Sequence, residues 1–374
     1  MGALLGIFFH AVGGFAAGSF YIPYNKVKNW AWEVYWLIGG FFSWIIVPWI
    51  VAWLTIPELK AVVHEILHNP DISSNVFWAY FFGMLWGVGG LTFGLTMRYL
   101  GMSLGMAIAL GFTAAFGTLA PPIFAGNFGA LMSTNSGIVT FIGVLVTLAG
   151  IYVVGLAGMR KDKELSSDKK TEHIKEFNLR KGILVAIFSG IMSACFAYGL
   201  QAGNPIADMS IAQGTKPLFQ NTAVLIVVLA GGFTTNFIWC VILMIRNRTA
   251  GDIIKKENNP FVSNFIFSAL AGATWYFQFM FYGMGAANLG REYDFASWSI
   301  HMAFIIAFSN MWGLILKEWS GAGKRTLRTI LTGILVLVIS TMIIGAGSYI
   351  KNKELSAAKG SGDTMVTQVI NTDQ

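Results

Sequence analysis

The chain has 374 residues, of which 55% are hydrophobic and only 11% are charged, whereas about 25% of residues are charged in an average soluble domain. This composition excludes a water-soluble domain and indicates a helical membrane protein, because apolar runs of about 20 residues recur along the chain. The net charge of +7 is explained by basic loops between these runs, so it does not indicate a nucleic-acid partner.

The apolar runs predict an all-α integral membrane protein with ten transmembrane helices. Backbone polar groups in lipid must pair within their own segment, and the strict alternation of barrel strands is absent. The predicted spans, in chain order, are 3–24, 33–57, 75–97, 100–123, 138–158, 182–203, 218–245, 263–287, 294–316 and 327–350. The first span has no basic segment before it, and we predict that it is an uncleaved helix instead of a signal peptide.

Most of the 25 Lys and Arg residues lie in the connections that follow odd-numbered spans. Because basic loops stay on the cytoplasmic side, we predict a multi-pass membrane protein with both termini outside. The connection 159–181 holds the largest group of basic residues, and we predict that it is a charged cytoplasmic loop. The segment 351–374 is polar, and we expect it to be a disordered tail.

Two patterns recur at nearly the same spacing along the chain. Gly143-Val-Leu-Val is followed by Gly155, and Gly333-Ile-Leu-Val is followed by Gly345, a shift of 190 residues. Trp86 and Trp275 precede Leu-Gly pairs with a shift of 189 residues. The chain is therefore predicted to hold two five-helix halves, 1–158 and 182–350. Since five spans per half is an odd number, the halves are inverted, as in many secondary transporters, with a substrate site between them.

Two neighbouring helices in 275–304 each carry a stripe of polar and aromatic residues. The stripes are Trp275, Gln278 and Tyr282 on the eighth span, and Asp294, Trp298 and His301 on the ninth. Their spacing places each trio on one helical face. Polar groups in hydrocarbon face a cavity or a partner, and they often mark a transport pathway.

His10 and His301 are the histidines within predicted spans. His10 shares a face with Gly6, Gly14 and Gly18, and such a small-residue face packs against protein instead of lipid. Asp294 and His301 are two turns apart, about 10 Å along the axis. We predict that His301, Asp294 and His10 couple transport to protons, with no other cofactor. The alternatives are packing histidines and, for Asp294, a cap of the ninth helix.

Neutral polar groups on an apolar, aromatic wall suit a sugar better than an ion or an apolar drug. The predicted substrate-binding residues are His10, Asn236, Trp275, Gln278, Tyr282, Trp298 and His301. The alternative for the aromatic members is a packing or interfacial role, because the chain has 13 Trp and 30 Phe residues.

The segment His64-Glu65-Ile66-Leu67-His68 matches the zinc-binding pattern H-E-x-x-H. It lies in an amphipathic segment, 58–69, typical of a helix at the membrane surface, which Pro70 is expected to end. No third ligand follows in the sequence, so we predict a solvated histidine pair and no metal site. A surface zinc peptidase is the remote alternative. Cys195 and Cys240 lie in predicted spans, and we expect packing roles for both.

Six strings along the chain resemble the L-rhamnose/proton symporter family of the drug/metabolite transporter superfamily. They are FYIPYNKVKNWAWE (20–33), LTMRYLGMSLG (95–105), EFNLRKG (176–182), WYFQFMFYGMG (275–285), EYDFASWSIHM (292–302) and GLILKEW (313–319). The resemblance implies a transporter and not an enzyme, with ten helices in two inverted halves. It also implies uptake of L-rhamnose with a proton across a bacterial inner membrane. Gln278, Asp294 and His301 fall within these strings, whereas 58–74 and 351–374 depart from the family pattern.

Two further alternatives to this interpretation remain: a carrier with another substrate and a sugar sensor. A carrier of the same fold would transport another sugar or small metabolite. A sugar sensor would bind the sugar without moving it, and only a flux measurement separates the two.

Overall fold

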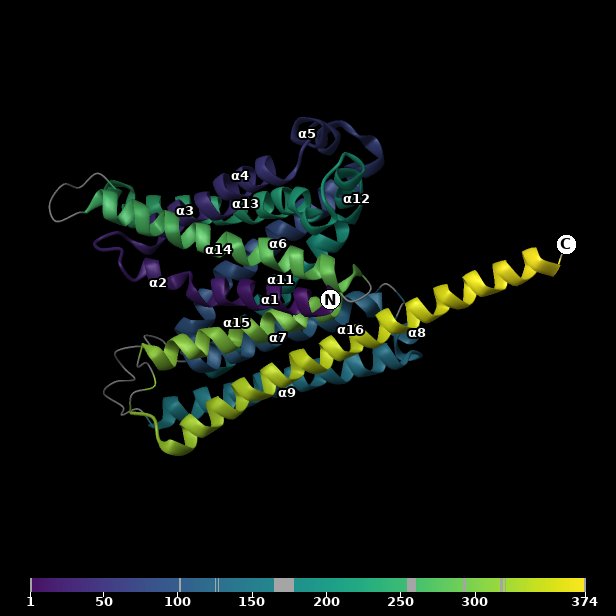
Figure 1. Ribbon diagram of the computed structural model, residues 1–374. Coiled ribbons are helices and arrows are strands. Elements are labelled where there is room, and N and C mark those ends of the chain that lie inside the picture. Colours follow the sequence, from purple (N-terminus) through teal and green to yellow (C-terminus); the bar gives the residue numbers. More distant parts are fainter. Residues whose placement is uncertain are drawn as a thin grey trace.

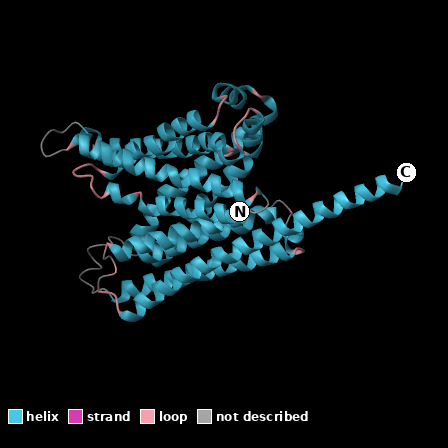
Figure 2. Ribbon diagram, in the orientation of Figure 1, coloured by secondary structure: helices cyan, strands magenta, loops and turns pink. Residues whose placement is uncertain are grey.

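The computed structural model describes residues 2–100, 102–124, 126, 128–164, 178–253, 260–291, 294–316, 319 and 321–372. Within these ranges all regular secondary structure is helical (Figure 2). The helices, in chain order, are α1 (Gly2–Ser19), α2 (Tyr21–Tyr24), α3 (Trp32–Phe41), the π-helix η1 (Phe42–Ile46), α4 (Val47–Thr55), α5 (Leu59–His68), α6 (Pro70–Leu100), α7 (Met102–Phe124), α8 (Phe128–Met132), α9 (Asn135–Glu164), α11 (Leu179–Ala202), α12 (Asn204–Ala212), the 3-10 helix η2 (Pro217–Phe219), α13 (Thr222–Asn247), the 3-10 helix η3 (Ala250–Ile253), α14 (Phe261–Leu289), α15 (Asp294–Ile315) and α16 (Lys324–Thr372).

Eight stretches of this helical structure are long and apolar enough to cross a membrane. They are Leu4–Tyr24, Trp32–Thr55, Pro70–Thr96, Asn135–Lys161, Arg180–Ala212, Pro217–Asn247, Ala296–Ile315 and Lys324–Lys351. The other two predicted spans, 100–123 and 263–287, coincide with α7 and α14, which do not meet this criterion. The prediction of an all-α membrane protein is confirmed, and the number of ten spans stays a prediction.

Local sequence explains several helix ends. Asn178 precedes α11, and its side-chain oxygen accepts a hydrogen bond of 3.0 Å from the backbone N–H of Lys181. Arg248 follows α13 in the left-handed conformation that ends many helices, with φ 56°. Pro70 was expected to end the amphipathic helix. Instead, α5 already ends at His68, and Pro70 is the first residue of α6, a position that proline favours.

Small residues bring the helices of the bundle into close contact. Along α1, a Cβ atom added to Gly6 would lie 2.9 Å from the Leu289 side chain of α14. Added to Gly18, it would lie 3.1 Å from the backbone N of Ser309 in α15. The predicted small-residue face of α1 is therefore confirmed as a face that packs on protein. Elsewhere α11 packs on α6 and α7, α3 packs on α13 and α14, and α9 lies beside α16 (Figure 1).

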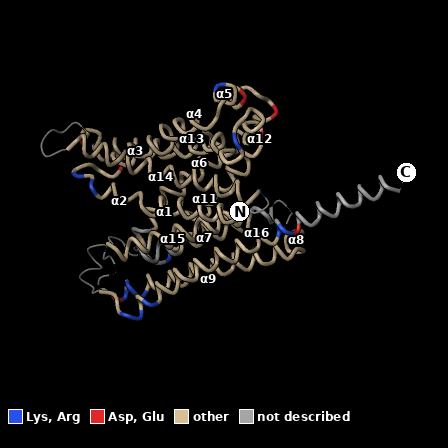
Figure 3. The backbone as a smooth tube through the Cα atoms, viewed as in Figure 1, with Lys and Arg blue, Asp and Glu red and all other residues tan. Residues whose placement is uncertain are grey.

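Lys and Arg residues gather at one end of the bundle, where α2 and the neighbouring ends of α9 and α16 lie (Figure 3). Of the predicted loop 159–181, residues up to Glu164 belong to α9, and 165–177 lie outside the described residues. At the other end of the sequence α16 runs to Thr372. The side chains of the predicted tail beyond 354 are not among those described, and its disorder stays a prediction.

Candidate functional site

Two histidines from distant parts of the chain meet in the interior of the bundle. His10 of α1 is 0% exposed, and His301 of α15 is 2% exposed. Their ring centroids are 5.7 Å apart at an interplanar angle of 62°. Tyr282 of α14 lies edge-on to both rings, with centroid distances of 5.4 Å to His10 and 5.1 Å to His301. We call these three residues the histidine cluster.

Glycines on the neighbouring helices give the two imidazoles their space. A Cβ atom added to Gly285 of α14 would lie 2.7 Å from His10 Nε2. A Cβ atom added to Gly13 of α1 would lie 2.9 Å from His301 Cε1 and 3.0 Å from the carbonyl oxygen of Gln278. Each ring therefore rests directly on the backbone of another helix, which fixes the distance between the two histidines.

Several polar atoms of this region are buried without a hydrogen-bond partner among the described residues. They include both ring nitrogens of His10, Nδ1 of His301 and the side-chain nitrogen of Gln278. Most buried polar atoms in native proteins have a partner. Buried and unpartnered imidazole and amide nitrogens in one place are suited to a proton and to the hydroxyl groups of a ligand.

Trp298 of α15 also lies beside the histidine cluster, but its indole nitrogen already has a hydrogen-bond partner. Its indole N–H donates a hydrogen bond of 3.0 Å to the carbonyl oxygen of Thr113 in α7. Its ring lies 5.8 Å from that of Tyr282 and 6.1 Å from that of Phe196. Trp298 thus offers an aromatic surface to this region and links α15 to α7.

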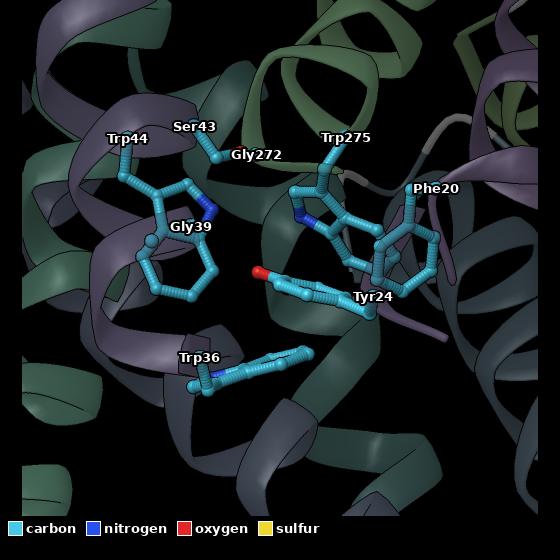
Figure 4. Close-up of a pocket in the computed structure, with 9 residues that line it drawn as sticks. Phe20, Tyr24, Trp36, Gly39, Ser43, Trp44, Gly272 and Trp275 are labelled. Atoms are coloured by element: carbon cyan, nitrogen blue, oxygen red, sulfur yellow. The ribbon is translucent and has the colours of Figure 1, made fainter. Parts of the chain in front are cut away.

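A second group of side chains surrounds a cavity closer to the basic end of the bundle. Its lining is aromatic and glycine-rich and consists of Phe20, Tyr24, Trp36, Gly39, Gly40, Ser43, Trp44, Gly272 and Trp275 (Figure 4). We call this the aromatic cavity. Its volume is about 10 Å³, which is near the minimum that one water molecule requires. It lies between α14 on one side and the segment from α1 to η1 on the other.

Asn236 of α13 does not line the aromatic cavity itself, but it contacts the lining residue Trp36 and does not belong to the histidine cluster. Its side-chain oxygen accepts a hydrogen bond of 3.1 Å from the indole N–H of Trp36. Its side-chain nitrogen donates to the carbonyl oxygen of Gly232, 2.9 Å away. The predicted substrate-binding residues therefore divide into two groups: Asn236 and Trp275 at the cavity, and the others around the histidine cluster.

Aromatic rings connect the two groups through the interior. Trp86 of α6 lies 6.0 Å from Trp44 and 5.2 Å from Phe279, measured between ring centroids. Phe279 lies 5.0 Å from Phe196, which in turn lies 6.1 Å from Tyr282. The cavity and the histidine cluster are thus parts of one continuous aromatic interior.

Of the nine residues that line the cavity, only Trp275 was predicted from the sequence as a site residue. The eight others were missed, among them Tyr24, Trp36, Ser43 and Trp44. The sequence did contain a signal for these residues: the segment 20–44 is rich in aromatic residues, and its first part is one of the strings that resemble the family. The π-helix η1, which carries Ser43 and Trp44, is not evident from the residue pattern. Such single π-turns are frequent at functional sites.

Asp294, the third predicted proton-coupling residue, is the first residue of α15. Its side chain lies outside the described part of the structure. The role of Asp294 in proton coupling stays a proposal.

The H-E-x-x-H pattern lies on α5, away from both groups. His64 and His68 stack with centroids 4.5 Å apart, and Glu65 accepts a hydrogen bond of 2.8 Å from Asn69. Within the described ranges, no three His, Cys, Asp or Glu side chains form a group that could hold a metal ion. Cys195 and Cys240 are buried and free, as their predicted packing roles require.

Comparison with known proteins gives matches over nearly the whole chain. Residues 2–349 match the family described as L-rhamnose-proton symport protein (RhaT). A protein of Klebsiella pneumoniae named L-rhamnose-proton symporter is 38% identical over 345 residues, which is 92% of this chain and 97% of that protein. A protein of Mannheimia succiniciproducens with the same name is 39% identical over 349 residues, covering 92% of this chain and 98% of that protein.

Proposed function

The chain belongs to the L-rhamnose-proton symport protein family, and we propose that it imports L-rhamnose together with a proton across a bacterial inner membrane. The relatives that carry this name match this chain over almost their whole length. The protein is a transporter and not an enzyme. The protons are its coupling ions, and no other cofactor takes part.

The proposed architecture is ten spans in two inverted halves that alternate between outward-open and inward-open arrangements. The packing supports it. In the first half α1 packs on α14 and α15, and in the second half α11, its counterpart, packs on α6 and α7. Exchanging the halves converts one set of contacts into the other, as expected for two repeats related by a twofold axis in the membrane plane.

The contacts between α9 and α16 show the same relationship between the two halves at the level of single residues. Gly143 faces Ile344, and Gly333 faces Val154. The shift of 190 residues seen in the sequence converts the first pair into the second. This self-complementary contact is what a twofold axis between the two helices produces.

The orientation that we propose places both termini in the periplasm. The gathering of Lys and Arg at the end of the bundle near α2 supports it, because that end would be cytoplasmic (Figure 3). The aromatic cavity is then nearer the cytoplasm than the histidine cluster.

The histidine cluster is the proposed place of proton binding. Imidazole is the side chain whose protonation changes near physiological pH. Because the two rings are 5.7 Å apart, charge repulsion disfavours protonation of both, and the pair takes up one proton at a time. Proton entry through 100 mV supplies about 2.3 kcal/mol. Asp294 is the proposed proton relay at the periplasmic end of α15.

Hydrogen bonds between the two halves close the cytoplasmic side in this arrangement. The side-chain oxygen of Asn264 accepts from the backbone N–H of Lys28 at 3.0 Å, and its nitrogen donates to the Lys28 carbonyl at 2.7 Å. Glu33 accepts from Asn247 at 3.0 Å and from Thr249 at 2.7 Å. We propose that these bonds break when the carrier opens inward.

The observation that carries the proton-coupling proposal is the buried contact between His10 and His301 in a chain of this family. In proteoliposomes, adding L-rhamnose should make the external medium more alkaline as protons enter with the sugar. His301→Gln should abolish this alkalinisation, whereas His68→Gln, a matched change on the exposed α5, should leave it intact. Proton-linked uptake that persists in His301→Gln would remove His301 from the mechanism.

The same preparation separates the alternatives. Transport of another solute without competition by L-rhamnose would indicate a different substrate within the same fold. Binding of L-rhamnose without any flux would indicate a sensor.

A further inference from the structure

We infer that the aromatic cavity is where the pyranose ring of the transported sugar is held, with an apolar C–H face of the sugar against the rings and its hydroxyls on the buried polar atoms of the lining. The inference rests on the proposed function and adds to it the location and the binding mode of the substrate. It separates the sugar position from the histidine cluster, to which we assign the proton.

Three polar atoms of the lining have no hydrogen-bond partner within the part of the chain that the structure describes. They are the hydroxyl of Ser43 and the indole nitrogens of Trp44 and Trp275. Ser43 is 1% exposed and Trp44 is 4% exposed. The indole nitrogens of Trp44 and Trp275 face each other across the cavity, and the Tyr24 hydroxyl lies between them (Figure 4). Buried donors without partners are costly, and a ligand with several acceptors would satisfy them.

The walls around these donors are faces and edges of aromatic rings. The centroids of Phe20 and Trp275 are 3.8 Å apart, and those of Tyr24 and Trp36 are 6.0 Å apart at 30°. A 6-deoxyhexose matches this combination, because it presents hydroxyl groups at its rim, a face of C–H bonds and a methyl group. An inorganic ion would not use the ring faces, and an apolar drug would leave the donors without partners.

The cavity must widen to admit a sugar, and its lining is built from segments that permit movement. A volume of about 10 Å³ has room for about one water molecule. Ser43 and Trp44 lie on the π-helix η1, where the backbone hydrogen bonds depart from the α-helical register. Gly39 of α3 and Gly272 of α14 are in contact through their backbones, so the two helices can slide without side chains between them. The structure therefore corresponds to a closed form of the binding site.

The position of the cavity explains how sugar and proton would influence each other. Trp275 and Tyr282 lie on the same face of α14, about 10 Å apart along the helix axis. Phe279 stands between them and contacts Trp275, with centroids 6.0 Å apart. A shift of Trp275 on sugar binding would thus be passed along α14 to the ring that touches both histidines.

Exchange measurements test the sugar position without the proton gradient. In proteoliposomes at equal pH on both sides, the exchange of labelled for unlabelled L-rhamnose reports sugar binding and reorientation. Trp44→Phe and Trp275→Phe keep an aromatic ring and remove one donor. Each should raise the KM for exchange about tenfold, the effect of losing one buried hydrogen bond to the ligand. Trp53→Phe is the matched control, because Trp53 on the adjacent α4 is 72% exposed and should leave KM unchanged.

Ser43→Ala provides a second, smaller change in case a tryptophan variant does not fold. Loss of monodisperse elution in detergent identifies a variant that does not fold. It should raise KM in the same direction. Exchange in the parent protein with unchanged KM in all three cavity variants would overturn the sugar position while leaving the proposed function intact. A parent protein that does not exchange L-rhamnose would overturn the proposed function itself and this inference with it.

Discussion

His10 in the first helix and His301 in α15 lie edge to face in the protein interior, although they are near opposite ends of the sequence, with ring centroids 5.7 Å apart. The position of each imidazole ring depends on a neighbouring helix as well as on its own. The backbone of α14 at Gly285 supports His10, and the backbone of α1 at Gly13 supports His301. Any movement of α1 against α14 and α15 therefore changes the distance between the two imidazoles, which couples protonation of the pair to the arrangement of the helices.

Adding a methyl group at Gly285 tests this arrangement. The Cβ atom of Gly285→Ala would lie 2.7 Å from His10 Nε2 and 2.8 Å from its two neighbouring ring carbons, so the imidazole must move. Since small displacements of reacting groups have large effects on rate, proton-driven uptake should fall at least about tenfold. Gly94→Ala in α6 is the control, because no atom lies within 4 Å of its added Cβ. Normal uptake by Gly285→Ala would show that the fixed position of His10 is unimportant.

Asn236 is expected to act on transport by holding Trp36. Asn236→Ala removes the acceptor of the Trp36 indole N–H and should lower the stability by about 1 kcal/mol. It should also raise the KM for L-rhamnose. Asn288→Ala removes a similar side chain that donates to the carbonyl of Met284 in its own helix, and its KM should match that of the parent. Thermal unfolding in detergent and initial uptake rates measure the two effects.

The contact between Glu164 and the start of α16 predicts a pH dependence of stability. Hydrogen bonds from the Thr326 hydroxyl and the Gly323 N–H, each 2.7 Å long, hold the pKa of the Glu164 carboxyl below its ordinary value of 4.5. A lowered pKa contributes stability that is present above the ordinary value and is lost as the pH falls through the pKa of the folded state. The parent protein should therefore have a higher Tm than Glu164→Gln at pH 7.

That difference in Tm should shrink as the pH is lowered below 4.5. In a Thr326→Val background, which lacks the main donor to Glu164, replacing Glu164 should have a smaller effect at pH 7. A difference in Tm that stays constant from neutral to acid pH would contradict this account of the carboxyl.

Breaking the contact between Asn264 and Lys28, which lies on the proposed cytoplasmic side, should favour the inward-open arrangement. Asn264 is 0% exposed, and Asn264→Ala removes both of its hydrogen bonds to the Lys28 backbone. The α2–α3 connection should then be cut faster by a protease added from the cytoplasmic side. Saturating L-rhamnose should alter this rate in the parent protein, and equal cleavage of parent and variant would argue against the gate.

Removal of metal should have no effect on transport. His64 and His68 lie on α5, where Glu65 pairs with Asn69, and no described third ligand is near. Chelator treatment should leave L-rhamnose uptake unchanged, and His64→Gln should not alter the metal content of the purified protein. Loss of uptake on chelation, with recovery on zinc addition, would contradict this prediction and would support a zinc site at the H-E-x-x-H pattern.

The sequence by itself determined the class of the protein and most of its helices. Long apolar runs require helices in lipid because the backbone has no other partner there, and this argument needs no tertiary contact. The glycine face around His10 was also readable, because its period of four residues places the small side chains on one side of α1. The family followed from strings spread along the chain.

The pairing of residues was decided only by the tertiary structure. Helical period shows that Gln278 and Tyr282 share a face, but it does not show which other helix that face meets. The contact of His10 with His301, and the separation of Asn236 from both, depend on which glycine backbones approach each other across the bundle. The aromatic cavity has the same origin. It exists because the π-helix turns Trp44 toward Trp275 while Gly39 and Gly272 let α3 and α14 touch, and these contacts between segments leave no periodic signal in the sequence.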